Sequence, residues 1–201
     1  QQSIQADFPG IEVLPVAADF LHPFQLPDPQ TMPLRNVVYF PGSTIGNFER
    51  DEAIDLLRVM HAEAGEDGAM LIGIDLQKDP AVIHAAYNDS AGVTAEFNLN
   101  MLRHLNRIFG SDFDLDAFEH RATYRPDEGR VVIELVSARE QEAHLGGARI
   151  AFEDGESIIT EYSHKYTLDD FAAMANEAGF NVEQTWADPR EWFSVQYCTR
   201  D

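Results

Sequence analysis

A loop with two glycines at the end of an apolar run could bind a small ligand. The run covers residues 36–40, and the loop covers residues 42–47. A β-branched run that stops at glycines is typical of a buried parallel strand, and ligands of open α/β sheets lie beyond the carboxyl ends of such strands. Glycine lets a backbone approach a ligand closely, while Thr44 and Asn47 add compact hydrogen-bonding groups. The sequence contains neither Gly-x-Gly-x-x-Gly nor Gly-x-x-x-x-Gly-Lys, so this loop is not one of the common nucleotide-binding loops.

A carboxylate next to an aromatic ring, Asp19 followed by Phe20, comes after an earlier apolar run at residues 11–17, which we expect to be a strand. The carboxylate could accept a hydrogen bond from the exocyclic amine of an adenine, and the ring could pack on the base. In the alternative interpretation, Asp19 caps a turn and Phe20 belongs to the core. The residues themselves leave both interpretations open.

A second carboxylate, Glu161, lies two residues before Ser163 in a run that also contains Ile158 and Ile159. Residues two apart on a strand share a face. A carboxylate beside a hydroxyl on such a strand could bind a ring that carries an N–H group. Alternatively, this face is solvated and the pair has no function, which is the more frequent case for charged side chains.

The sequence predicts no metal site. Its seven histidines show no paired ligand spacing, and the acidic run at 112–116 lacks the glycine and the terminal glutamate of a calcium loop. The single cysteine, Cys198, excludes an internal disulfide. We expect Cys198 to be a small buried residue in a C-terminal strand.

Composition argues against several classes of partner. The chain has only 14 Lys and Arg residues and a formal net charge of −21, so it lacks the clustered cations that neutralise nucleic-acid phosphates. No apolar run approaches the roughly 18 to 20 residues that span a bilayer. We therefore expect no nucleic-acid partner, no membrane partner and a cytoplasmic location.

The elements that position these residues alternate between strand and helix at both ends of the chain. We expect strands at 11–17, 36–40 and 69–75, and a helix at 51–64. A capping pattern from Thr167 to Asp170 predicts another helix that ends at Gly179 and precedes two apolar strands. Those strands are expected near 180–186 and 192–198.

The middle of the chain has a different character. Asp79 followed by Pro80 is a capping and first-turn signal that predicts a helix reaching about residue 87. Apolar residues at helical spacing predict a second helix at about 94–109. Two-residue alternation from 120 to 165 then predicts an antiparallel meander of about four strands. The whole chain is therefore predicted to be an open α/β sheet interrupted by an α+β subdomain.

Four blocks of the sequence together resemble the histidine Nα-methyltransferases of ergothioneine biosynthesis. They are GSTIGN at 42–47, AYND and GVTAEFN within 86–98, DFDLDAFEH at 112–120 and TEYSHK at 160–165. The blocks keep the order and approximate spacing of that family, and the resemblance runs from about Pro9 to the C-terminus. It implies an S-adenosylmethionine-dependent enzyme that trimethylates the α-amine of histidine to give hercynine.

The resemblance also implies an organisation. A Rossmann-like methyltransferase sheet would be interrupted by a substrate-binding subdomain, with a partial methyltransferase domain at 1–77, the subdomain at 78–165 and a return to the first domain at 166–201. Matching positions place Asp19 and Phe20 against the adenine of the cofactor. Gly42 and Thr44 would line the junction between cofactor and amino acid.

Six residues are implied to contact the substrate. Asn47 and Tyr87, the expected catalytic residues, would hold its carboxylate and amine, and Glu161 and Ser163 would hydrogen-bond the imidazole. Two apolar residues complete the set. Phe97 would pack nearby, and Ile133 would stand against the imidazole where well-known members carry a methionine.

Part of the family pattern is missing from this sequence. The glycine-rich cofactor loop and the first strands of the sheet would precede Gln1, so we expect an N-terminally truncated and inactive fragment of a monomeric parent, prone to self-association through an exposed strand edge. Two alternative functions stay open. The chain could belong to an N-methyltransferase of another aromatic amino acid, or to a degenerate homologue that binds without catalysis.

Overall fold

The computed structural model describes residues 2–200, which form two compact units. The first unit comprises the residues up to Thr44, Glu49–Ile74 and the residues from Thr167 onward. The second comprises Ile45–Phe48 and Asp75–Tyr166. Residues 45–48 therefore group with the second unit, although the sequence placed them in the first domain.

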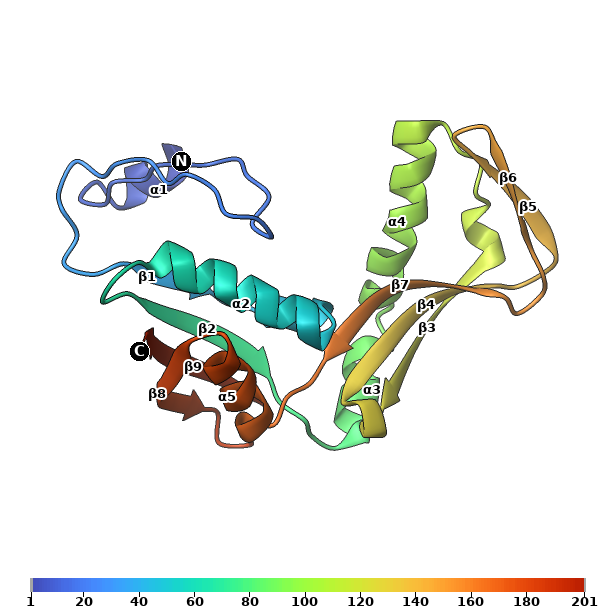
Figure 1. The fold of residues 1–201 in the computed structure, drawn as a ribbon. Coiled ribbons are helices and arrows are strands. Elements are labelled where there is room, and N and C mark those ends of the chain that lie inside the picture. The colour runs from blue at the N-terminus through green and yellow to red at the C-terminus, as the bar shows by residue number, and fades with distance from the viewer. Residues whose placement is uncertain (1, 201) are drawn as a thin grey trace. The chain divides into compact units, whose positions relative to one another are not determined.

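The first unit is built on a mixed four-stranded sheet with the strand order β1-β2-β9-β8 (Figure 1). Strands β1 (Val37–Phe40) and β2 (Ala69–Asp75) are parallel, whereas β8 (Phe180–Ala187) and β9 (Phe193–Arg200) are antiparallel. All four strands lie where the sequence predicted them, so the expected α/β class is confirmed.

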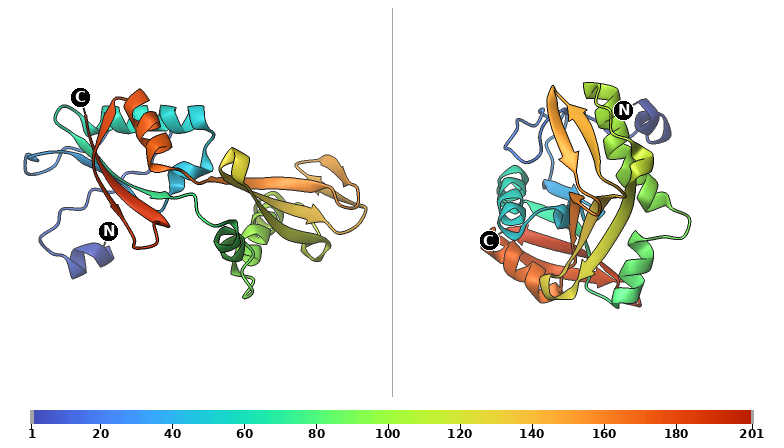
Figure 2. Two further views of the ribbon diagram at one scale, coloured as in Figure 1. Left: turned by 90° about the horizontal axis from the view of Figure 1, so that it is seen from below. Right: turned by 90° about the vertical axis from the view of Figure 1, so that its right-hand side faces the viewer.

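Two helices cover this sheet and pack against each other (Figures 1 and 2). Helix α2 (Arg50–Ala64) begins with a capping box between Glu49 and Glu52, and helix α5 (Leu168–Glu177) begins at Thr167, whose hydroxyl accepts from the Asp170 N–H at 3.0 Å. Both helices match their sequence predictions. The helices bury Ile54, Leu57 and Phe171 against the strands. Phe180 of β8 is also fully buried.

The strand expected at 11–17 does not form. Among the described residues, no helix or strand lies between α1 (Gln2–Asp7) and β1. An extended segment becomes a strand only where a neighbour supplies ladder hydrogen bonds, and β1 pairs only with β2 in the described sheet. The apolar side chains Ile11 and Val16 are consequently about half exposed, at 54% and 44%.

The second unit joins two helices to a three-stranded antiparallel sheet of order β3-β4-β7. The strands are β3 (Phe118–Arg125), β4 (Arg130–Ser137) and β7 (Ser157–His164). Helices α3 (Pro80–Tyr87) and α4 (Val93–Phe109) pack on this sheet, mainly on β3 (Figure 1). Both helices confirm their predictions.

The expected four-stranded meander is wrong in its pairing. The region contains five strands, and β5 (Gln141–Leu145) pairs with β6 (Ala148–Phe152) as a separate hairpin, so that β7 returns to β4. Gly146 and Gly147 both have positive φ and make the two-residue turn of this hairpin. The hairpin contributes Ala143 and Phe152 to a buried cluster with Phe113 and Phe118. Packing between distant residues therefore decides the strand order.

Two further expectations concern the single cysteine and membrane-spanning helices. Cys198 is buried in β9, as predicted, and burial raises the pKa of its thiol to about 12. None of the helices formed by residues 2–200 has the length and apolar character that crossing a membrane requires.

Candidate functional site

Strand β7 carries the pair that the sequence singled out, and a β-bulge sets the direction of their side chains. Ile133 of β4 pairs with Glu161, but the next residue, Glu134, pairs with Ile159, so Thr160 is an extra residue on β7. Bulges re-aim side chains and are frequent next to active sites. Here the bulge breaks the alternation, and the neighbours Thr160 and Glu161 both face one pocket.

This pocket has a volume of about 340 Å³ and lies entirely within the second unit. Three of the six predicted substrate residues line it, namely Phe97 from α4, Ile133 from β4 and Glu161 from β7. Phe97 is 72% exposed, so its ring has a free face to offer a ligand. The pocket surface is mainly apolar, and Glu161 is the one carboxylate among the lining residues. This combination suits a small ring that donates a hydrogen bond.

Glu161 is the one carboxylate among the residues that line this pocket. Burial raises the pKa of its carboxyl above the ordinary value of 4.5, while the positive charge of Lys165 and a hydrogen bond with the Asn47 side chain act in the opposite direction. Ionising the Glu161 carboxyl therefore costs more free energy in the folded protein than in water. A donor from a ligand would offset that cost.

Replacing Glu161 by glutamine is expected to stabilise the protein at neutral pH. A carboxyl whose pKa rises on folding binds more protons in the folded chain than in the unfolded chain, so the wild type loses stability as the pH rises from below 4.5 through the raised value. Glutamine does not titrate and avoids that loss. Urea unfolding at about pH 4 and about pH 7 measures the change in unfolding free energy.

The control for this experiment is Glu119→Gln, which removes an exposed carboxylate from β3 of the same unit. It reports the effect of losing one negative charge from an acidic protein. A Glu161→Gln advantage that grows toward acid pH instead of neutral pH would contradict the assigned direction of the pKa shift.

A compact polar cluster lies next to Glu161 along β7. The Tyr87 and Ser163 hydroxyl oxygens are 2.8 Å apart, and the Lys165 ammonium donates to each of them at 2.7 Å. The same ammonium pairs with the Asp75 carboxylate at 2.9 Å, and Lys78 pairs with the other oxygen of that carboxylate. The structure thus brings Tyr87 and Ser163 together.

Tyr87 is held from several sides at the carboxyl end of α3. The Asn88 side chain makes two hydrogen bonds to the Ala122 backbone of β3, one as donor and one as acceptor. His120 of β3 accepts at Nδ1 from the Asn98 amide, so its Nε2 carries the proton and donates to the Tyr87 carbonyl at 2.8 Å. These bonds fix the backbone from which the phenol extends.

The start of α4 is fixed by Asp89. Its carboxylate accepts from the backbone N–H groups of Thr94 and Val93, which hold the pKa of Asp89 at about 2. A carboxylate at a helix N-terminus also complements the helix dipole. Asp89 thereby places the first turns of α4, which carry Phe97 and Asn98, beside β4 and β7.

Asn47 belongs to the same unit through the short helix η1 (Thr44–Asn47). Gly46 packs directly on β7, where a Cβ atom would lie 2.8 Å from the His164 carbonyl oxygen. The His164 ring lies 2.9 Å from the Gly46 carbonyl oxygen, and the Tyr166 hydroxyl donates to the Ile45 carbonyl. We expected the glycines of this loop to let a ligand approach the backbone. Gly46 instead lets η1 lie directly against the backbone of β7.

The four predicted cofactor residues all lie in the first unit. Asp19 caps a turn, because its carboxylate accepts from the Leu21 N–H at 3.0 Å and lies 3.2 Å from the His22 ring. Phe20 is not a core residue, since it is 45% exposed. Gly42 has a φ of 77° and open space around it, and Thr44 begins η1.

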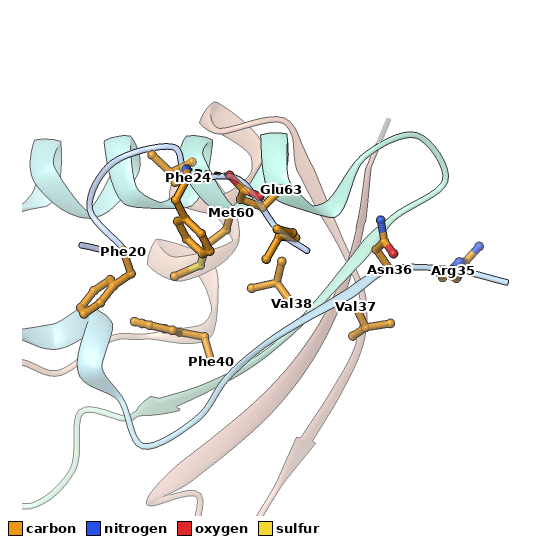
Figure 3. Close-up of a pocket in the computed structure, with 11 residues that line it drawn as sticks. Phe20, Phe24, Arg35, Asn36, Val37, Val38, Phe40, Met60 and Glu63 are labelled. Carbon is orange, nitrogen blue, oxygen red and sulfur yellow. Dashed lines mark hydrogen bonds between the residues drawn. The ribbon is translucent and has the colours of Figure 1, made fainter. Parts of the chain in front are cut away.

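Phe20 lines a second pocket, of about 420 Å³, in the first unit (Figure 3). Its ring lies 5.9 Å from that of Phe40, and Phe24 and Met60 form the adjoining wall (Figure 3). The backbone N–H of Phe24 donates to Glu63 at 3.3 Å. The pocket is mainly apolar and runs along β1 and α2.

Sequence reasoning assigned no role in the site to Lys165 or His120. Lys165 follows Ser163 by two residues, so the alternation that linked Glu161 to Ser163 also extended to Lys165. Nothing in the local sequence pattern indicates the bond from His120 to the Tyr87 carbonyl. Among the described residues, no three His, Cys, Asp or Glu side chains gather in a way that could hold a metal ion.

The chain is an α/β protein, and its second unit has a pocket with one carboxylate and a mainly apolar surface. The model of one family, described as histidine-specific, S-adenosylmethionine-dependent methyltransferases, matches residues 1–200. The chain belongs to this family. The resemblance seen in the sequence is thereby confirmed.

Two relatives and one solved structure show the range of similarity. The histidine N-alpha-methyltransferase of Mycolicibacterium smegmatis is 36% identical over 201 residues, which cover 98% of this chain and 61% of that relative. The L-tryptophan methyltransferase trpM of Psilocybe serbica is 25% identical over 166 residues, which cover 80% of this chain and 45% of the relative. This chain thus spans less than two thirds of the length of these curated relatives.

The structure of an S-adenosylmethionine-dependent methyltransferase from Clostridium acetobutylicum aligns with a TM-score of 0.49 at 8% identity. The alignment covers 99% of this chain and 68% of that one. This similarity is too low to add to the family assignment.

Proposed function

We propose that the protein is an S-adenosylmethionine-dependent methyltransferase that trimethylates the α-amine of histidine to give hercynine. The observation that carries the proposal is Glu161, a half-buried carboxylate in a pocket whose surface is mainly apolar and includes Phe97 and Ile133, in a chain of a histidine-specific family. A carboxylate accepts several hydrogen bonds, so Glu161 can accept from a ring N–H in addition to its bond with Asn47. The imidazole of histidine supplies one.

The substrate residues then divide by role. Glu161 accepts from the imidazole N–H, and Ser163 hydrogen-bonds the ring from the same face of β7. Ile133 and Phe97 pack against the ring. Asn47 and Tyr87 hold the carboxylate and the amine, since an amide and a phenol can each donate and accept. All six residues belong to the second unit, which supports one substrate site.

The cofactor residues are proposed with the roles that the family suggests. The chemistry of the side chains fits an adenine, because Asp19 has an exposed carboxylate that can accept from the exocyclic amine and Phe20 has an exposed ring. Gly42 and Thr44 would line the junction toward the amino acid. Gly42 suits close approach, since nothing lies within 4 Å of the place of a Cβ atom.

The protein has little covalent chemistry to perform. Bound S-adenosylmethionine supplies a methyl group that its sulfonium has already activated, so orientation and exclusion of water provide most of the rate. Asn47 and Tyr87 hold the amine with its lone pair toward the methyl group. The proton that the amine releases passes to water or to a neighbouring polar side chain, and no dedicated strong base is needed.

A second candidate function keeps the reaction and changes the substrate to another aromatic amino acid. The similarity to an L-tryptophan methyltransferase favours this alternative, because pocket residues rather than the fold set the choice of substrate. Indole also carries a ring N–H. Ser163 counts against indole, since the indole ring has no nitrogen acceptor for its hydroxyl.

Methyl transfer measured by mass spectrometry tests the proposal. The whole protein is incubated with S-adenosylmethionine and each of the twenty standard amino acids. The expected result is the addition of three methyl groups to histidine and to no other amino acid. Transfer to tryptophan would support the second candidate, and transfer to none would overturn both. The cytoplasmic location and the absence of nucleic-acid partners stay proposals from composition.

A further inference from the structure

The polar cluster beside Glu161 contains a buried lysine that none of the proposed roles uses. Lys165 is only 3% exposed. Its ammonium donates to the Tyr87 hydroxyl and to the Ser163 hydroxyl, each at 2.7 Å, and pairs with Asp75 at 2.9 Å. An ammonium has three N–H donors, and these three partners use all of them. Lys165 therefore acts on a ligand only through the groups that it holds.

The ammonium constrains the protons of the two hydroxyls. An ammonium can only donate, so the Tyr87 and Ser163 oxygens both accept from Lys165. The two oxygens are 2.8 Å apart, so one of the hydroxyls donates its proton to the other. The second hydroxyl proton has no acceptor among these three side chains. It is left for an acceptor outside them.

We propose that Lys165 is a positioning residue that makes the Tyr87–Ser163 pair a hydrogen-bond donor toward the substrate. This inference rests on the proposed function, because it assigns the acceptor as the unprotonated ring nitrogen of histidine. Ser163 lies on the same face of β7 as Glu161, which accepts from the other ring nitrogen. Together, the carboxylate and the hydroxyl pair select a neutral imidazole, a ring with one N–H group and one bare nitrogen.

Without the ammonium, this selectivity is lost. The hydroxyl pair would regain free lone pairs, and either hydroxyl could then accept from a ligand as readily as donate. Asp75 holds the ammonium in place through the 2.9 Å ion pair, because a buried ammonium needs a close counter-charge. Lys78 contacts the same carboxylate but neither hydroxyl, so it provides a matched control.

The test measures binding of histidine and of phenylalanine, by calorimetry and competition, to the whole protein and to its Lys165→Met and Lys78→Met variants. Phenylalanine has the same backbone groups but no ring nitrogen. Lys165→Met is expected to weaken histidine binding by about 10- to 30-fold and phenylalanine binding by less than about 3-fold, the loss of one directed hydrogen bond. Lys78→Met is expected to change both by less than about 3-fold, since the hydroxyl pair remains intact.

Each other outcome has a definite meaning. A wild type that binds no histidine would overturn the proposed function, and the inference with it. A wild type that binds histidine and a Lys165→Met variant with an unchanged ratio of histidine to phenylalanine affinity would overturn the inference alone. Equal losses for both ligands would show a structural role, which also overturns it.

A variant that fails to fold is covered by a second one. Lys165→Met leaves Asp75 with one cation fewer, and a buried charge without its partner is strongly destabilising. The double variant Lys165→Met with Asp75→Asn removes both charges of the pair. It is expected to show the same selective loss of histidine binding, and the same unchanged ratio would overturn the inference.

Discussion

Replacement of Glu161 by alanine is expected to lower kcat/KM for histidine by about 10- to 100-fold, the cost of removing a charged acceptor from a buried hydrogen bond. The carboxylate lies in the pocket with Phe97 and Ile133, and burial has already raised its pKa. Without it, the imidazole N–H enters the pocket with no acceptor. The apolar contacts of the ring survive, so the loss reflects the hydrogen bond rather than the packing.

Binding of phenylalanine supplies the comparison for Glu161→Ala. Its ring has no N–H group, so its affinity is expected to stay the same or to increase as the pocket becomes less polar. The measurements are steady-state methylation of histidine and competition binding of phenylalanine. Equal losses for both amino acids would show that Glu161 supports the fold of the pocket and does not recognise the imidazole.

Replacement of Gly46 by alanine is expected to destabilise the second unit by about 1–3 kcal/mol, the usual cost of forcing an extra methyl group into a packed site. The new Cβ atom would lie 2.8 Å from the carbonyl oxygen and 3.3 Å from the nitrogen of His164. Both atoms belong to the backbone of β7, which cannot move aside as a flexible side chain can. The short helix η1 must shift instead.

Asn47 belongs to η1 and hydrogen-bonds Glu161, so a shift of η1 is expected to disturb this contact. Histidine binding should therefore weaken together with stability, which urea unfolding and calorimetry of the same samples measure. Gly10→Ala is the matched control, because nothing lies within 4 Å of the place of its Cβ atom. A Gly46→Ala protein with unchanged stability would contradict the packing of η1 on β7.

Local sequence patterns were sufficient for most of the helices and strands. Asp79 and Pro80 begin α3, Thr167 caps α5, and the apolar run before the glycine loop forms β1, each as predicted. These signals act between residues a few positions apart, so a single sequence contains them. The strand expected at 11–17 is the exception, because an apolar run forms a strand only if a neighbouring strand pairs with it.

For the site, the sequence by itself determined that Glu161 and Ser163 share a strand face and that Asn47 ends a glycine loop. The tertiary structure alone decided the bulge at Thr160, the return of β7 to β4 and the burial of Lys165 between Tyr87 and Asp75. Each of these depends on contacts between residues far apart in the chain. Their free energy comes from packing and from the mutual satisfaction of buried polar groups, and these form only when the elements meet.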